Sequence, residues 1–266
     1  MIQDVFKAFI TCFKAFKLMN QYRLWHYYLW VMIASFILFV LSIYLFFNLS
    51  NVVGEWVLEK TESYQMISTQ SETIKNLLSK TSAFIFRMFI KVLGLYLFFK
   101  FSKYLYLILF SPFFAYISEK MEEKLFHIKT PFSVTKLAKD AIRGVVVSVR
   151  NLIIELMVSA MVLVAMFFFP ILSLPLGLFS LFVGFYYFGY AVMDYNHERW
   201  NMSISNGSRR VRKYSGHAIG LGMFYYLASM LPIVGWLFSG INTTIAAVML
   251  EQEKHPLLTQ KTVENS

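Results

Sequence analysis

The sequence predicts an all-α integral membrane protein with two long transmembrane helices, two re-entrant helical hairpins and an N-terminal amphipathic helix at the membrane interface. Only 15% of the 266 residues are charged, whereas soluble domains have about a quarter of their residues charged. Hydrophobic residues make up 58% of the chain and occur in long runs, as in helices that enter a bilayer. Lys and Arg residues flank these runs unevenly, which is typical of membrane orientation signals.

The whole chain, 1–266, is expected to form a single membrane domain, because no linker rich in Pro, Gly or Ser divides it. Its net charge of +10 would suit nucleic acid, anionic lipid or an anionic substrate. Because the basic residues lie in blocks beside the apolar runs, we expect a lipid bilayer as partner and no nucleic acid. The single cysteine, Cys12, is expected to be a small packed side chain.

The segment 1–19 is predicted to be an interfacial amphipathic helix. Its apolar residues recur at helical spacing, with lysines between them; they are Phe6, Phe9, Ile10, Phe13 and Phe16. Such a helix lies with its aromatic face in lipid and its lysines near anionic headgroups. The following apolar run is too long for a signal peptide, so we expect the segment to be retained.

The first predicted span is 27–49, because this uncharged stretch would form about 35 Å of helix, enough to cross a core of about 30 Å. Its aromatic residues Tyr27, Tyr28 and Trp30 suit an interfacial belt. The polar segment 50–83 is predicted to be an outer loop. Four Lys or Arg residues precede the first span and seven lie between positions 114 and 150, so both termini are expected on the cytoplasmic side.

The second predicted span, 84–114, contains four basic residues: Arg87, Lys91, Lys100 and Lys103. Cations inside a membrane helix often line a polar or ion-conducting path. Alternatively, they extend along their own methylenes to the two interfaces. The sequence leaves both alternatives open.

Two proline-centred hairpins follow, at 151–193 around Pro170 and Pro175 and at 218–250 around Pro232. The arms of the second hairpin have about 15 residues, or about 22 Å of helix, which is too short to cross. Both hairpins are therefore predicted to enter from the cytoplasm and return. The segment 194–216 is predicted to be basic and cytoplasmic, and 251–266 to be a cytoplasmic tail.

The candidate chemistry is anion binding, because broken helices expose N–H groups and the chain is basic. Glu155 lies in an apolar run five residues after Arg150, and is either structurally paired or part of a proton path. His197-Glu198 begins like a zinc motif, but Asn201 replaces its second histidine. No phosphate-binding loop motif or clustered catalytic set is found, so we expect no metal, cofactor, nucleotide or enzymatic activity.

Several short motifs are similar to those of one membrane protein family. They are Ser111-Pro112-Phe113, Ser118 to Glu122, Met193 to Arg199, the arginines Arg209, Arg210 and Arg212, Gly220-Leu221-Gly222, and Leu231-Pro232. In their order and spacing, from about residue 20 to 250, the sequence resembles the CysZ-type sulfate permease family, which shares a domain with a eukaryotic etoposide-induced membrane protein. Asn196 stands where that family has a proline.

The resemblance implies two transmembrane helices with two hemi-penetrating hairpins, homo-oligomers, and sulfate uptake for cysteine synthesis across the bacterial inner membrane. The family places a sulfate site at a Gly-Leu-Arg turn before the first span. Here Tyr22-Arg23-Leu24 stands in that region without the glycine, so Arg23 is the only anion-binding residue carried over.

An anion channel or permease for sulfate or a related oxyanion is thus the expected function. The alternative is a non-transporting scaffold that shapes the bilayer. The predicted anion-binding residue is Arg23. The residues predicted for a pore or polar path are Arg87, Lys91, Lys100, Lys103, Arg150 and Glu155.

Overall fold

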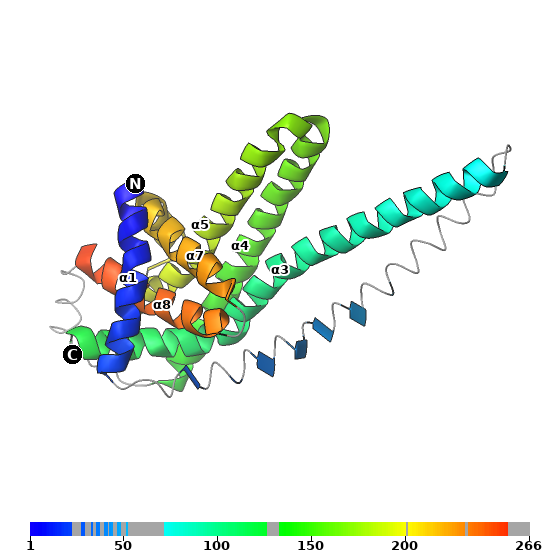
Figure 1. Ribbon diagram of the computed structural model, residues 1–266. Coiled ribbons are helices and arrows are strands. Elements are labelled where there is room, and N and C mark those ends of the chain that lie inside the picture. The colour runs from blue at the N-terminus through cyan, green and yellow to red at the C-terminus, as the bar shows by residue number, and fades with distance from the viewer. Residues whose placement is uncertain are drawn as a thin grey trace. The chain divides into compact units, whose positions relative to one another are not determined.

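Helices contain nearly all of the residues that the computed structural model describes, which are 1–22, 28–29, 33, 36–37, 40–41, 43–44, 47–48, 52, 72–126, 133–200, 202–231 and 234–254. The α-helices are α1 (Ile2–Gln21), α3 (Glu72–Phe126), α4 (Val134–Phe168), α5 (Ser173–Arg199), α6 (Ile204–Lys213), α7 (Ser215–Ser229) and α8 (Val234–Lys254) (Figure 1). A short 3-10 turn, η1 (Pro170–Leu172), joins α4 to α5. These residues include no β-strand, so the all-α prediction is confirmed for them.

The chain divides into two compact units, Met1–Ser35 with Tyr104–Ser266 and Phe36–Lys103. The second unit contains the first part of α3 and several helical positions between 36 and 52. Several of its described apolar side chains, such as Val92, are exposed. The described positions of the predicted span 27–49 are helical, and its other positions lie outside the described residues.

Helix α3 begins at Glu72, so residues 72–83, assigned above to the outer loop, are helical. This stretch contains neither Gly nor Pro, and its polar residues are compatible with a helix. Pro112 lies inside α3 and cannot donate a hydrogen bond to the carbonyl of Ile108. The hydroxyl of Ser111 donates to that same carbonyl at 3.0 Å. The Ser-Pro pair therefore keeps the helix continuous while satisfying the freed acceptor.

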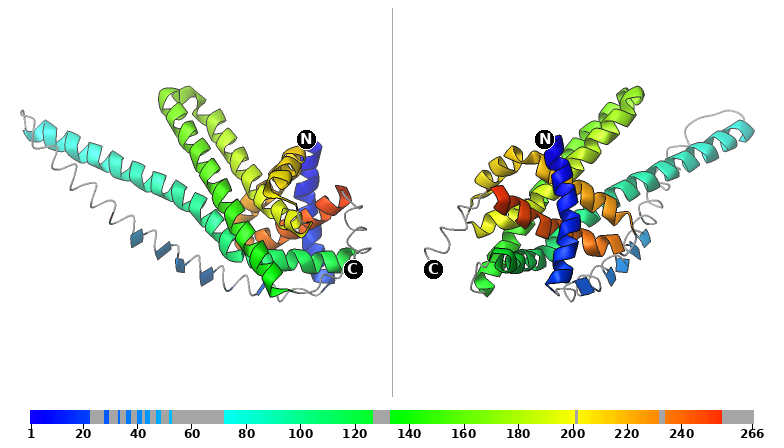
Figure 2. Two further views of the ribbon diagram at one scale, coloured as in Figure 1. Left: turned by 180° about the vertical axis from the view of Figure 1, so that it is seen from behind. Right: turned by 60° about the vertical axis from the view of Figure 1, so that its left-hand side comes forward.

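Three helical stretches are long and apolar enough to cross a membrane: Gly94–Leu125, Ala138–Phe168 and Pro170–His197. The last two form the first predicted hairpin, and Figures 1 and 2 show α4 and α5 side by side up to their turn. Phe169 leaves the helical conformation, with φ −129° and ψ 71°, as the residue before a proline usually does. The predicted proline turn is thereby confirmed. Its arms are longer than predicted, because α4 begins at Val134 and α5 continues to Arg199.

The second predicted hairpin corresponds to α7 and α8. Helix α7 has 15 residues, or about 22 Å, as its sequence predicts. Helix α8 has 21 residues, and its last turn is polar. Pro232 itself lies outside the described residues.

Helix α1 is amphipathic as predicted, but it also has a buried face that the sequence analysis did not identify. Phe6 and Phe13 are exposed, as expected for a lipid-facing side, whereas Ala8, Cys12 and Ala15 are buried. This small-residue face packs against α7 and α8. The thiol of Cys12 lies 3.4 Å from the carbonyl of Ala8, so the packed cysteine is confirmed.

Tyr28, placed above in an interfacial belt, is instead buried against protein. Its hydroxyl donates to the side-chain oxygen of Asn242 in α8 at 2.5 Å, and its ring lies 4.7 Å from that of Phe238. The belt prediction is wrong for Tyr28, because a phenol that finds a buried partner is more stable inside the protein.

Helices α5 and α7 approach so closely that only glycine fits at two positions. A Cβ atom on Gly189 would lie 1.9 Å from the carbonyl oxygen of Ala218, and one on Gly222 would lie 1.9 Å from that of Phe185. Between these points the rings of Phe188 and Tyr225 stack at 3.7 Å. Small residues allow this kind of close backbone packing between membrane helices.

We expect Gly222→Ala to destabilise the protein, because the added methyl group meets backbone atoms that cannot rotate away. Overpacking of this kind costs about 1–3 kcal/mol or more, which corresponds to a thermal midpoint lower by roughly 2–10 °C. Thermal unfolding in detergent measures this midpoint. Gly177→Ala is the matched control, since its Cβ would meet only the flexible end of Met166 at 3.5 Å. Equal midpoints for the two variants would contradict the close α5–α7 contact.

Candidate functional site

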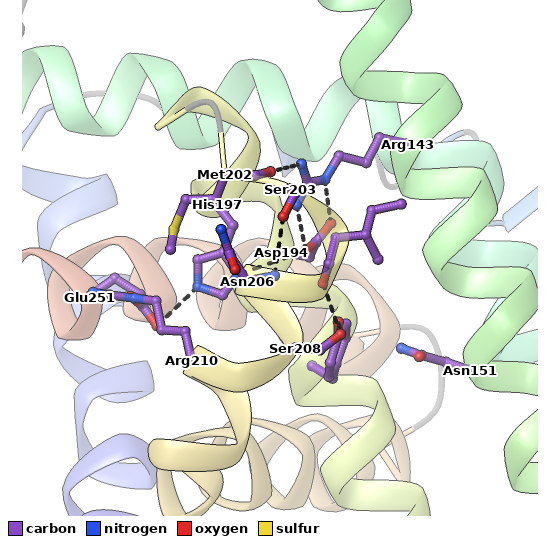
Figure 3. Close-up of polar contacts among 12 residues, drawn as sticks. Arg143, Asn151, Asp194, His197, Met202, Ser203, Asn206, Ser208, Arg210 and Glu251 are labelled. Carbon is purple, nitrogen blue, oxygen red and sulfur yellow. Dashed lines mark hydrogen bonds and ion pairs between the residues drawn. The ribbon is translucent and has the colours of Figure 1, made fainter.

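A cluster of five charged or titratable side chains, four of them buried and one partly buried, joins four helices of the first unit. We call it the core charge cluster; its members are Arg143 of α4, Asp194 and His197 of α5, Arg210 of α6 and Glu251 of α8 (Figure 3). Helix α6 approaches it through Gly207, where a Cβ atom would lie 3.0 Å from Nδ1 of His197. A larger residue there would push α6 away from the charges.

One end of the core charge cluster is a forked ion pair. Nε of Arg143 donates to one carboxylate oxygen of Asp194 at 2.9 Å, and a terminal nitrogen donates to the other at 3.0 Å. The remaining terminal nitrogen donates to the carbonyl of Met202. Two parallel bonds of this kind fix geometry as well as charge. The fork therefore ties α4 to the end of α5 and to the segment before α6.

The other end is the pair between Arg210 and Glu251, at 2.6 Å. The guanidinium group of Arg210 also lies 5.0 Å from the centre of the Trp200 ring. His197 stands between the two pairs, 3.7 Å from Asp194 and 3.6 Å from Glu251. Burial raises the pKa of Glu251, but His197 and Arg210 lower it more, so the net pKa lies below the usual range of a glutamate.

Further side-chain hydrogen bonds extend this network to α3. The hydroxyl of Ser118 donates to the side-chain oxygen of Asn196 at 3.1 Å, and the amide of Gln252 donates to the carboxylate of Glu122. Because two arginines face two carboxylates, the core charge cluster is compensated by its own members. Such a cluster holds helices together and leaves little charge free for a ligand.

A second group of polar residues surrounds Arg150, near the middle of α4. We call it the Arg150 cluster; it comprises Arg150, Asn151, Tyr190 and Ser208. The guanidinium group donates to the hydroxyl of Ser208 at 3.2 Å and to the amide oxygen of Asn151 at 3.1 Å, and it lies 4.6 Å from the centre of the Tyr190 ring. Its Nε is buried without a hydrogen-bond partner.

The Arg150 cluster contains no carboxylate, which distinguishes it from the core charge cluster. In the part of the chain that the structure describes, the contacts of Arg150 are a hydroxyl, an amide oxygen and an aromatic ring. All of these orient a guanidinium group without neutralising it. Arg150, predicted as a polar-path residue, is therefore a half-buried cation available to an anion.

Glu155, the other predicted residue of α4, is fully buried and accepts a hydrogen bond from the hydroxyl of Tyr104 in α3 at 2.6 Å. This contact joins α3 to α4 and favours the structural alternative for Glu155 over the proton path. The hydroxyl of Tyr226 in α7 also lies beside Glu155, since both approach Gly184 closely.

The four cations predicted in the second span all belong to the second unit. Lys103 is buried, and the ammonium group of Lys100 lies 5.4 Å from the centre of the Tyr96 ring. Both lie within the apolar stretch Gly94–Leu125, whereas Arg87 and Lys91 precede it. The side chains of Arg87 and Lys91, and the whole of Arg23, lie outside the described residues, so these assignments stay predictions.

The sequence analysis did not identify Arg143, His197 or Glu251 as a connected set. Asp194 and Arg210 were noted only through the resemblance. The signal was present in part, because Arg143, Asp194, His197 and Glu251 each lie near one end of an apolar run. Their pairing could not be seen, since Asp194 is 51 residues from Arg143 and Glu251 is 41 residues from Arg210.

Comparison with known proteins adds one finding. Residues 11–239 match the family described as sulfate transporter CysZ/etoposide-induced protein 2.4. None of the curated proteins matches the chain. The matched region includes α3 to α7 in full and both polar clusters, apart from Glu251.

We expect Asp194→Ala to destabilise the protein strongly, because it leaves the guanidinium group of Arg143 buried without its carboxylate. Breaking a buried pair in this way costs about 3–5 kcal/mol. Lys7→Ala is the control: it removes an ion pair with Glu253 whose side chains are 41% and 56% exposed, worth about 0–1 kcal/mol. Thermal unfolding in detergent compares the two. If Asp194→Ala unfolds no earlier than Lys7→Ala, the core charge cluster does not hold the helices together.

Proposed function

Because the chain belongs to the sulfate transporter CysZ/etoposide-induced protein 2.4 family, we propose that it is a membrane permease for sulfate or a related oxyanion. The observation that carries this proposal is the family match over residues 11–239. Two physical features support it. The chain has helices able to span a membrane, and its net charge of +10 favours an anion. Arg150 adds a half-buried cation that pairs with no carboxylate among the described residues.

We propose that the hairpin of α4 and α5 enters the bilayer and returns without reaching the opposite side. Its turn is apolar and exposed, with Phe167 at 80% and Ile171 at 92%. A turn that reached water would be expected to carry polar residues. Its backbone is also suited to lipid, because its N–H groups are bonded. The N–H of Phe169 donates to the carbonyl of Ala165 at 2.8 Å, and the N–H of Leu172 donates to the carbonyl of Phe169 at 3.0 Å.

The remaining features of the proposal follow from the charge pattern and the family. Both termini lie in the cytoplasm of a bacterial cell, and the protein resides in its inner membrane as a homo-oligomer that takes up sulfate for cysteine synthesis. Arg23 is proposed to contact the anion at the start of the first span. No catalytic role is assigned, and neither a nucleotide nor a cofactor is required.

The second candidate function, a scaffold that shapes the bilayer, is favoured by one observation. The exposed apolar turn of the α4–α5 hairpin and the exposed Phe6 and Phe13 of α1 could both act as wedges in one leaflet. A scaffold needs no anion flux, so transport measurements separate the two functions.

Cysteine labelling tests the re-entrant hairpin. In a Cys12→Ser background, Ile171→Cys should not react with a membrane-impermeant maleimide added to intact cells, because its turn lies in hydrocarbon. A cysteine introduced in 50–71 should react from outside, and one in 255–266 only after permeabilisation. External labelling of Ile171→Cys would show that α4 and α5 cross completely.

Purified protein in vesicles should take up radiolabelled sulfate, with the rate falling when unlabelled sulfate competes. Arg23→Ala should reduce uptake about tenfold or more, because one charge-assisted contact is worth about 1.5–3 kcal/mol. Cross-linking of the same vesicles should give dimers or larger species. Vesicles that change curvature but show no sulfate uptake would overturn the permease and favour the scaffold.

A further inference from the structure

Helix α6 brings a second arginine toward the Arg150 cluster. Ser208, which accepts from Arg150, and Arg212 are four residues apart on α6 and therefore share one face. The guanidinium groups of Arg150 and Arg212 are both close enough to the hydroxyl of Tyr186 to act on it electrostatically. Helices α4 and α6 thus direct one cation each toward the same place, beside the tyrosines of α5.

Hydroxyl groups surround this place. The ring of Tyr186 lies 6.4 Å from that of Tyr190, and the hydroxyl of Tyr190 is 2.5 Å from that of Ser208. Phenol and serine hydroxyls can each donate one hydrogen bond and rotate to suit an acceptor. In the structure the hydroxyl of Ser208 donates to the carbonyl of Ile204 at 2.8 Å, so it becomes a donor beside the two arginines when it rotates toward a bound anion.

The two arginines at this place form no ion pair within the part of the chain that the structure describes. Arg143 and Arg210 each have a carboxylate within 2.9 Å. Neither Arg150 nor the exposed Arg212 contacts a carboxylate there. Two neighbouring guanidinium groups repel each other, and a half-buried one is costly without a counter-charge. A bound anion would remove both costs.

We propose that Arg150, Ser208 and Arg212, with the hydroxyls of Tyr186 and Tyr190, bind a tetrahedral oxyanion. The planar forks of two arginines match the oxygen atoms of a sulfate or phosphate group, and the hydroxyl groups complete its coordination. The proposal rests on the proposed function for its ligand class and adds an anion site separate from Arg23.

Two sources could supply this group, a free oxyanion or the phosphate of an anionic lipid. In the proposed topology the site lies near the middle of α4, at the cytoplasmic end of the apolar arms of the hairpin, where dissolved sulfate and the inner-leaflet headgroups are both within reach. The shared chemistry is an oxyanion held by two arginines, and the experiment separates the sources.

The test is calorimetry on the full chain in nanodiscs of neutral phosphatidylcholine, titrated with sodium sulfate at low ionic strength. Arg212→Gln and Arg150→Gln should each weaken binding roughly ten- to a hundredfold, and Arg150→Lys should recover only part of the loss. The matched control is Arg209→Gln, which removes the same charge from an exposed position of α6 that, unlike Arg212, is not among the charges acting on Tyr186. Because Arg212 is exposed, its variant should fold even where an Arg150 variant does not.

Equal sulfate affinity for Arg212→Gln, Arg209→Gln and the parent would overturn the site. Sulfate uptake by vesicles that contain these variants separates this failure from failure of the permease. Normal uptake and binding in the variants refute the site alone, whereas specific loss of binding without any uptake by the parent refutes the permease alone.

If neutral nanodiscs bind no sulfate, retention of phosphatidylglycerol by the parent and Arg209→Gln, but not by Arg212→Gln, identifies a lipid headgroup as the ligand. Equal phosphatidylglycerol retention by all three proteins would then overturn the site.

Discussion

Helices α5 and α7 touch backbone to backbone at Gly189 and Gly222, and the positions of the neighbouring helices in the first unit depend on this contact. Hydrophobic burial does not hold helices together in lipid, because lipid tails are as apolar as the side chains. Close packing and polar bonds must do so instead. Helix α7 serves this purpose with small residues on several sides, so that α1 also packs closely against it at Gly220.

Buried ion pairs, together with close packing, hold the helices of the first unit in place. The core charge cluster lies where α4, α5, α6 and α8 meet, and its two arginines are matched by two carboxylates. Each pair joins helices that are distant in the sequence. Because these charges satisfy one another, they contribute to architecture rather than to ligand binding. The motifs that relate the chain to its family, including Asp194 and Arg210, belong largely to this framework.

The Arg150 cluster differs in one physical respect: within the described residues, the groups that contact its cation are neutral. Arginine therefore has two roles in this fold, and the role of each arginine depends on whether a carboxylate lies beside it. Arg143 and Arg210 are held by Asp194 and Glu251, whereas Arg150 remains able to attract an anion. This contrast places the candidate chemistry at one end of the α4–α5 hairpin.

Local pattern determined much of the architecture. Apolar runs, helical spacing and prolines predicted a membrane class, helix α1, the turn at Pro170 and the short arm α7, because these properties depend on residues that are neighbours in the chain. The polar content of 72–83 was misleading, since a helix tolerates it as well as a loop does. Among the predicted site residues, Arg150 and Glu155 received partners that their own segment could not reveal.

By itself the sequence determined most of the helical stretches, that they belong in a membrane, and that the chain carries excess positive charge. Only the tertiary structure decided which charges are neutralised, that Tyr28 and the small-residue face of α1 are buried, and that Ser208 lies against Arg150. The physical reason is the distance along the sequence over which each kind of interaction acts. Hydropathy and helix periodicity act over a few residues, whereas ion pairs and backbone contacts join positions tens of residues apart, which only folding brings together.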